Sequence, residues 1–295
     1  SQGFVIDGLG LGDRLGNSLS GLGDINGDGF GDFALGAWTA GSDNKGAVYV
    51  IFGRQEYFDP LLDIAGPRKF PLSGLDGTNG FRLDGTEAFE NLGYSVAGIG
   101  DLNNDGIDDF AVGTGFLGNV YVVFGRVTGF DATLDLAALN GSNGFKVDWV
   151  DGTSAVAAAG DVNNDGIDDL VIGDSTLNIS GLQSGQVYVI NGRNSSFNAT
   201  FSLGDLNGSN GFRINGPTNI SSAGVSGAGA GDFNGDGFDD IVVGASESAP
   251  FQHDDLPGSA YVVFGRPDPQ FGTSLNDILN GTPAGDRLNG LAGDD

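Results

Sequence analysis

The chain has 295 residues, enough for one large all-β domain or two ordinary domains. Its 39 acidic residues against 12 basic ones give a net charge of −27, which repels phosphate backbones and anionic lipid and argues against nucleic-acid binding. It has no cysteine, which excludes disulfides, zinc thiolates and a thiol nucleophile, and no apolar run of about 18 residues that could span a membrane.

One sequence unit occurs four times along the chain. Each copy starts with a strand that contains Gly-Phe, at 3–8, 80–85, 144–149 and 211–216. A strand rich in Gly, Ala and Ser follows, and then an acidic loop that begins at Asp24, Asp101, Asp161 and Asp232. An apolar strand comes next, and a Tyr-Val strand closes the unit at 49–54, 121–126, 188–193 and 261–266.

Short strands of β-branched and aromatic residues, separated by Gly, Asn and Asp turns, are typical of propeller blades. The sequence therefore predicts an all-β propeller with four blades of four-stranded antiparallel sheets. The series begins with a Gly-Phe strand and ends after a Tyr-Val strand, so we expect the strand at 3–8 to pair with the strand near 261–266 and close the ring. The alternative is half of a larger ring, completed by a second copy or by further sequence.

The predicted domains are a propeller at 1–266 and, at 267–295, a linker with partial repeats. Asp277, Asp286 and Asp295 are spaced nine residues apart in this second segment, as are Leu279 and Leu288. A Gly/Asp/Leu nonapeptide is typical of a calcium-binding β-roll. The alternative is a degenerate fifth blade strand at 285–290.

The four acidic loops have oxygen-bearing side chains at positions 1, 3, 5 and 9 and glycine at position 6. Ca²⁺ prefers about six to eight oxygen ligands, which alternate residues of a tight loop can supply. We also expect position 7 to give its backbone carbonyl to the ion and its side chain to the core. The predicted ligands of the four calcium ions, one ion per blade, are Asp24, Asn26, Asp28, Phe30 and Asp32; Asp101, Asn103, Asp105, Ile107 and Asp109; Asp161, Asn163, Asp165, Ile167 and Asp169; and Asp232, Asn234, Asp236, Phe238 and Asp240.

Position 12 holds an apolar strand residue in every loop, where an EF-hand has glutamate, so an EF-hand is excluded and position 9 must close the site. The glycine at position 6 is expected to adopt a left-handed conformation. At position 8, Asp108, Asp168 and Asp239 are expected to point outward and tune the field around their own ion. Gly31 takes this place in the first loop, which predicts a weaker first site.

The unit resembles the FG-GAP repeat of integrin α subunits and of many bacterial surface proteins, over about 3–266. The D-x-N-x-D-G-x-x-D loop, set between a Gly/Ala strand and an apolar strand, carries this resemblance. It implies Ca²⁺ on one face of a propeller and partner binding on the other, although integrin heads have seven blades and four units are counted here. The tail resembles the RTX repeat of proteins exported by type I secretion, in keeping with an N-terminus that has no signal-peptide pattern.

We therefore expect a secreted or cell-surface adhesion or binding module that is monomeric and non-enzymatic. No catalytic residue is predicted, because His253 is the only histidine and no nucleophile–base pair stands out. The alternatives are a carbohydrate-active hydrolase on the same scaffold and a structural spacer of a large surface protein.

The expected partner is a protein or a glycan that binds the face opposite the calcium loops. Four aromatic residues lie in loops predicted on that face, where they serve either as anchors for the partner or as packing under their own loops. They are Trp38, Phe116, Trp149 and Phe251.

Overall fold

The structure is a computed structural model in which nearly all regular structure is β. The described residues are 4–54, 68–115, 117–148, 154–175, 178–179, 182–183, 185–216, 222–246 and 258–265. Within them, the helices are 3-10 turns of three residues each, η1 (Ser42–Asn44), η3 (Leu72–Gly74), η4 (Leu136–Ala138) and η5 (Leu203–Asp205). The all-β prediction is confirmed.

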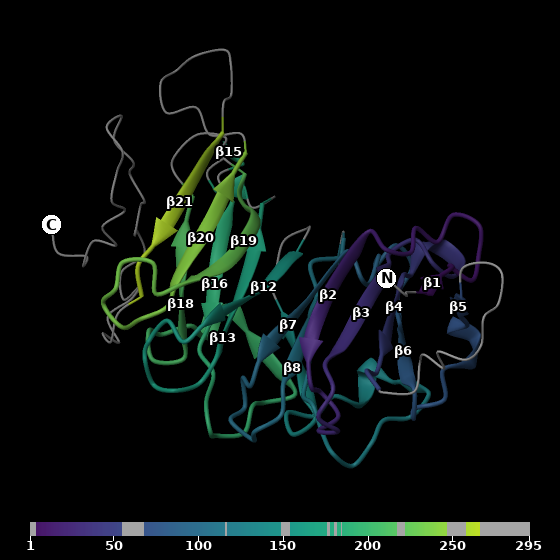
Figure 1. The fold of residues 1–295 in the computed structure, drawn as a ribbon. Coiled ribbons are helices and arrows are strands. Elements are labelled where there is room, and N and C mark those ends of the chain that lie inside the picture. Colours follow the sequence, from purple (N-terminus) through teal and green to yellow (C-terminus); the bar gives the residue numbers. More distant parts are fainter. Residues whose placement is uncertain are drawn as a thin grey trace, which may run out of the picture.

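Four antiparallel sheets follow one another along the chain, each a meander of neighbouring strands (Figure 1). Sheet 1 contains β2 (Ser18–Gly23), β3 (Asp32–Ala37), β4 (Ala47–Ile51) and β6 (Gly80–Asp84). Sheet 2 contains β7 (Ser95–Gly100), β8 (Asp109–Gly113), β9 (Val120–Val123) and β11 (Gly144–Asp148). Sheet 3 contains β12 (Ser154–Gly160), β13 (Asp169–Asp174), β16 (Gln186–Ile190) and β18 (Gly211–Asn215). Sheet 4 has β19 (Ala223–Gly231), β20 (Asp240–Ala245) and β21 (Ser259–Val263). The four-stranded antiparallel unit is thus present in sheets 1 to 3, and the described part of sheet 4 has three strands.

Short strands in the connections join consecutive sheets by parallel pairing. β10 (Thr133–Leu134) pairs with β6 of sheet 1, and β17 (Thr200–Ser202) pairs with β11 of sheet 2. β5 (Arg68–Phe70) pairs in the same way with β1 (Phe4–Ile6). β6 and β11 are the outermost strands of sheets 1 and 2, and each pairs in this way with a strand of the following sheet's connection. β1 therefore occupies, beside sheet 1, the position that the outermost strand of a preceding sheet would have. A separate two-stranded hairpin is formed by β14 (Asn178–Ile179) and β15 (Leu182–Gln183).

The predicted pairing of the strand at 3–8 with the strand near 261–266 is not formed among the described residues. β1 pairs with β5, and among the described residues β21 pairs with β20 alone. Phe4 and Ile6 of β1 pack on the buried cluster at the outer side of sheet 1. The pairing of β1 with β5 is not an alternative to ring closure, because β6 and β11 make the same parallel pairing and also pair antiparallel with β4 and β9. The Phe4 ring lies 6.0 Å from the Phe70 ring, measured between centroids. The inner strands β2, β7, β12 and β19 lie side by side in that order, with β2 and β19 at opposite ends of the series (Figure 1).

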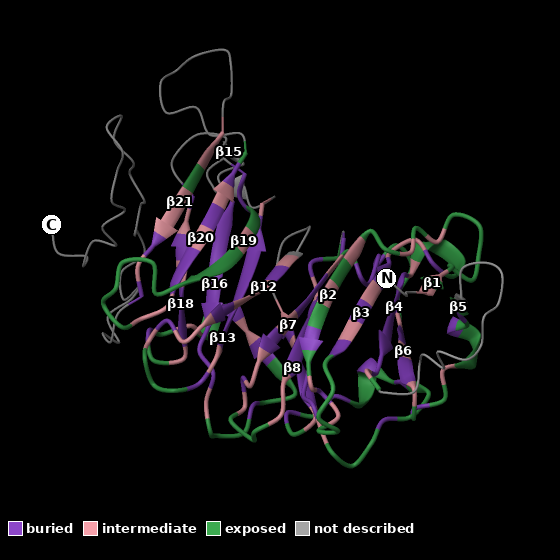
Figure 2. Cartoon of the chain, viewed as in Figure 1, coloured by how far each residue is buried: buried purple, intermediate pink, exposed green. Residues whose placement is uncertain are grey.

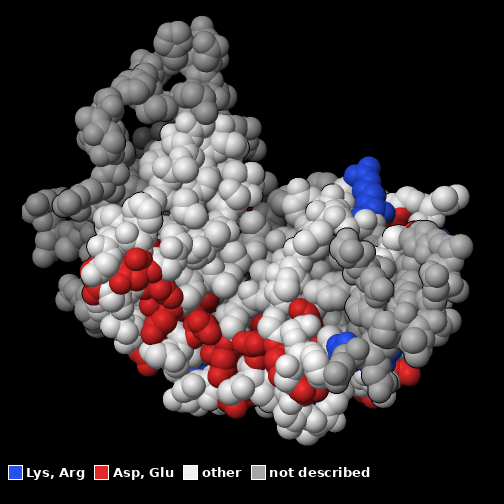
Figure 3. Space-filling view, viewed as in Figure 1, with Lys and Arg blue, Asp and Glu red and all other residues white. Residues whose placement is uncertain are grey.

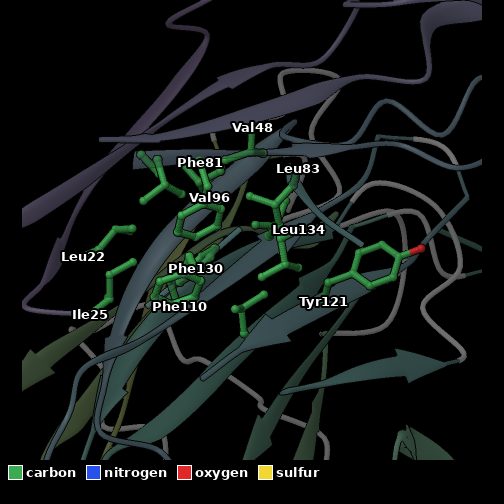
Figure 4. Packing of buried hydrophobic residues seen from close by; sticks show 14 of the residues in the cluster. Leu22, Ile25, Val48, Phe81, Leu83, Val96, Phe110, Tyr121, Phe130 and Leu134 are labelled. Atoms are coloured by element: carbon green, nitrogen blue, oxygen red, sulfur yellow. The ribbon is translucent and has the colours of Figure 1, made fainter. Parts of the chain in front are cut away.

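The apolar core lies between consecutive sheets, as three clusters at the three joints. Figure 2 shows buried residues concentrated on the strands and exposed residues in the loops. At the first joint, Leu22 and Ile25 of sheet 1 belong to the same buried cluster as Phe110 of sheet 2 (Figure 4). Phe81 stacks on Phe130 there, with ring centroids 4.4 Å apart. The second joint repeats this stack with a 4.5 Å separation between Phe145 and Phe197, so the first two joints follow one plan.

The two ends of the series expose apolar side chains that are buried at every internal joint. At position 2 of the acidic loop, Ile25, Leu102 and Val162 are at most 2% exposed, whereas Phe233 of sheet 4 is 70% exposed. At the other end, Leu19 of β2 is 69% exposed. The residues at the same place in β7 and β12 are Val96 and Val156, as their pairing with β8 and β13 shows. These two side chains are only 7% and 8% exposed. Within the part of the chain that the structure describes, sheets 1 and 4 therefore each have one flank that no other sheet covers.

This difference predicts unequal costs for two substitutions at the same loop position. Leu102→Ala is expected to lower the free energy of unfolding by about 2–5 kcal/mol, because it leaves a cavity between sheets 2 and 3. Phe233→Ala is expected to change it by less than about 0.5 kcal/mol, as for an exposed site. Urea unfolding followed by circular dichroism measures both. A comparable cost for Phe233→Ala would mean that a ring closes over sheet 4 in solution.

Candidate metal centre

The four acidic loops connect the inner strand of each sheet to its second strand. Numbered from the first aspartate, they run over 24–32, 101–109, 161–169 and 232–240. Their carboxylates contribute to a band of acidic side chains on the face shown in Figure 3. The loops thus bring the predicted ligands of neighbouring sheets to one side of the molecule, as the sequence predicts for a propeller.

Within each loop, the backbone folds around its own carboxylates. In the first loop, Asp24 accepts hydrogen bonds from the backbone N–H of Asp28 at 3.0 Å and of Gly29 at 2.8 Å. Asp28 accepts one from the N–H of Phe30 at 2.9 Å. The same three bonds recur in the other loops. Positions 1 and 5 are therefore held in one arrangement four times.

Glycine at position 6 makes this fold possible. Its φ angle is between +87° and +94° in all four loops, in the left-handed region where a side chain is strained. The left-handed turn predicted at this position is confirmed, and the four glycines are Gly29, Gly106, Gly166 and Gly237.

The aspartate at position 9 is buried and ties the loop to the end of the third strand. Asp109 accepts hydrogen bonds from the N–H of Leu102 at 3.0 Å and of Gly125 at 2.8 Å. Its counterparts Asp32, Asp169 and Asp240 make the equivalent pair of bonds. Each of these four carboxyl groups lies in a residue that is at most 3% exposed. Such burial without a counter-charge is costly for a carboxylate.

Burial raises the pKa of three of these groups far above the usual value for aspartate. The pKa of Asp32 rises to about 7, and that of Asp109 and Asp169 to about 8. Desolvation is the largest cause, and the carboxylates at positions 1 and 5 of the same loop raise the pKa further. A cation among these groups would favour their ionised forms and lower the pKa.

The amide at position 3 gives a second sign that the loops suit a cation. Asn26, Asn163 and Asn234 accept the N–H of position 5 through Oδ1, at 2.8 to 2.9 Å. In the second loop, Asn103 Oδ1 is buried and has no hydrogen-bond partner. Within the described ranges, no three or more His, Cys, Asp or Glu side chains converge as a formed metal cluster. Carboxylate and amide oxygens are nevertheless the donors that Ca²⁺ prefers, so the residues fit that ion.

Two expectations about the loops need correction. At position 7, Ile167 is buried as predicted, but Phe30 is 43% exposed and does not enter the core. At the three internal joints position 2 fills the core instead, since Ile25, Leu102 and Val162 are at most 2% exposed. An apolar residue stands at position 2 of every loop, and this signal could have identified it.

The position 8 aspartates also differ from expectation. They were expected to point outward, but Asp108, Asp168 and Asp239 each accept a backbone hydrogen bond from the loop of the preceding sheet. Their place therefore depends on the neighbouring sheet, which a pattern within one loop does not reveal.

Of the four aromatic residues expected at a partner-binding face, the structure describes Trp38. It is only partly exposed, and its ring meets Tyr94 edge-on with centroids 5.8 Å apart. The guanidinium of Arg14 lies 4.6 Å from the centre of the Trp38 ring. The Trp38 ring therefore packs between Arg14 and Tyr94, which favours a packing role for this residue. Phe116, Trp149 and Phe251 lie outside the described residues, as do His253 and the segment 267–295.

No helix among the described residues has the length and apolar character needed to cross a membrane.

Comparison with known proteins gives independent matches to the repeated unit. The FG-GAP repeat model matches residues 15–51, 153–190 and 223–263, which are three of the four predicted units. Integrin alpha pat-2 of Caenorhabditis elegans is 34% identical over 110 residues, covering 37% of this chain and 8% of that protein. Integrin alpha-5 of Xenopus laevis is 33% identical over 182 residues, covering 60% of this chain and 15% of that protein. The chain thus spans only a small part of these relatives.

Proposed function

Since this chain carries FG-GAP repeats like those of integrin α subunits, we propose that it is a calcium-dependent adhesion module of a secreted or cell-surface protein. It would bind a protein or glycan partner and catalyse no reaction. The observation that carries this proposal is the acidic loop, which recurs four times with the same internal hydrogen bonds and the same buried aspartate. The similarity to integrin α chains supports adhesion over catalysis.

In this proposal each loop binds one Ca²⁺ through positions 1, 3, 5 and 9, together with the backbone carbonyl of position 7. Each loop contains aspartates at positions 1, 5 and 9, and the one at position 9 is buried. The ion would supply the positive charge that lets all three ionise together. Its role is structural: it would hold the loop against the third strand through the position 9 aspartate.

The proposed organisation places the propeller at 1–266 and a linker with nonapeptide repeats at 267–295. The partner would bind on the loops opposite the calcium loops, and the resemblance of the tail to RTX repeats supports export by type I secretion.

A binding screen with and without calcium tests the function. The chain is applied to immobilised extracellular-matrix proteins and to a glycan array, in 1 mM Ca²⁺ and in a chelator, where the calcium level is chosen at about 100 times an expected dissociation constant near 10 μM. We expect at least one ligand that binds only with calcium. Binding that persists when the loops are stripped of metal would contradict the calcium-dependent role, and turnover of a glycan would favour the hydrolase.

A further inference from the structure

Each internal joint contains a hydrogen bond between two acidic loops. The backbone N–H of Asp24 donates to Asp108 Oδ2 at 2.7 Å, and that of Asp101 donates to Asp168 Oδ2 at 2.9 Å. The third joint has the same bond, from the N–H of Asp161 to Asp239 Oδ2 at 3.0 Å. In every case the donor is position 1 of one sheet's loop, and the acceptor is position 8 of the next sheet's loop.

A glycine makes room for the entering carboxylate at each of these joints. Gly23, Gly100 and Gly160 directly precede position 1 and have φ angles of +76°, +70° and +74°. A Cβ atom on any of them would lie 2.0 to 2.1 Å from the Oδ2 atom of the incoming aspartate, far inside van der Waals contact. The carboxylate therefore occupies the space that a side chain would fill, and we call this space the glycine slot.

The donor of this bond is also the first residue of the proposed calcium loop. Its side-chain oxygens are held by the N–H groups of positions 5 and 6, and its own N–H is held by the next sheet. Both ends of the residue are thus fixed before an ion arrives. A ligand that is fixed in advance binds more tightly, because less conformational entropy is lost on binding.

We propose that Asp108, Asp168 and Asp239 are positioning residues for the calcium site of the preceding sheet, and not for the site of the loop that contains them. This rests on the proposed calcium function of the loops. Each ion would then be held partly by the neighbouring sheet, so calcium binding and docking of that sheet stabilise each other by the same free energy. Calcium in these loops would fasten the joints as well as the loops.

The proposal reverses an expectation for the ends of the series. The first loop has Gly31 at position 8 and therefore no carboxylate there. Its Asp24 still donates its N–H to Asp108 of sheet 2, so the first site keeps its cross-sheet hydrogen bond. In the fourth loop, a Cβ on Gly231 would meet nothing within 4 Å, so its slot is empty among the described residues. The fourth site should therefore be the weakest of the four.

A double-mutant cycle at the second joint tests this assignment. Asp168→Asn is isosteric and removes the charge, and Gly100→Ala fills the slot without changing any charge. Each substitution is expected to raise the dissociation constant of one calcium site about tenfold. A change of this size corresponds to the loss of one hydrogen bond to a charged group. Calcium titration by calorimetry, with ions counted by native mass spectrometry, gives the affinity and the number of sites.

Combining Asp168→Asn with the loss of one calcium site at a time identifies which site Asp168 serves. Asp105→Ala deletes the second site and Asp165→Ala deletes the third. If Asp168 serves the second site, Asp168→Asn has no further effect in the Asp105→Ala background and keeps its full effect in the Asp165→Ala background. The opposite pattern would overturn the assignment, since it would show that Asp168 acts on its own loop.

Three further results test this inference and separate it from the proposed function. Gly31→Asp places the same carboxylate on sheet 1, where no described sheet precedes it, and should leave all affinities unchanged. A chain that binds no calcium at all would overturn both the proposed function and this inference. A chain that binds four ions but shows no effect of Gly100→Ala would overturn the inference alone.

Discussion

Removing calcium is expected to lower the melting temperature of the chain by about 20 °C or more. Four sites, each filled at 100 times its dissociation constant, contribute about 2.7 kcal/mol apiece and about 11 kcal/mol together. That is comparable with the whole free energy of unfolding of a typical domain. For a chain of this size, each kcal/mol moves the melting temperature by about 2–4 °C. Differential scanning calorimetry with saturating Ca²⁺ and in metal-depleted buffer measures the difference.

The fall in melting temperature on calcium removal should depend on pH. The raised pKa values of the buried aspartates show whether it grows or shrinks as pH rises. Asp32, Asp109 and Asp169 have folded-state pKa values of about 7 to 8, against 3.8 ordinarily. Between about pH 4 and pH 8, the folded metal-free chain keeps protons that the unfolded chain has released, so stability falls as pH rises. Metal-depleted protein should therefore melt higher at pH 5 than at pH 8, and saturating calcium should shrink or reverse this difference.

Magnesium at the same concentration is the control, because it demands a tighter octahedral shell and releases its water reluctantly. It should restore little of the lost stability. A calcium effect of only one or two degrees would count against a structural role for the ion.

Replacing the central carboxylate of one loop should remove one ion. Asp105→Ala deletes a proposed ligand in the middle of the second loop and also the acceptor of the Ile107 N–H. We expect native mass spectrometry to count three ions in place of four, with a lower melting temperature in calcium. Asp28→Ala, Asp165→Ala and Asp236→Ala should each have the same effect on their own loops.

The matched control is Asp131→Ala, an exposed aspartate in the connection of sheet 2. It should keep four ions and the original melting temperature. Four ions in Asp105→Ala would show that this carboxylate is not a ligand and would sink the loop assignment.

The sequence predicts features that depend on one unit alone. The strand order, the glycine turn at position 6 and the burial of the strand after each loop all follow from patterns within a few residues. The role of Asp108 could not be predicted in this way, because its partner Asp24 lies 84 residues earlier in the chain. The same is true of β5, whose pairing with β1 depends on how two sheets pack. Ring closure is predicted from counting strands, and counting does not include how each sheet packs on the next, which leaves β2 and β19 at opposite ends of the row of inner strands.

The glycine slot also makes the row of sheets modular and directional. Every internal sheet offers a slot to its successor and inserts a carboxylate into its predecessor, so the two sides of a sheet are not interchangeable. Deleting the unit of sheet 2 would bring Asp168 to the slot of Gly23, with no change in chemistry. Copying that unit would create one more joint of the same kind. The number of units could therefore change by duplication or loss in evolution, or by design, without any new interface having to arise.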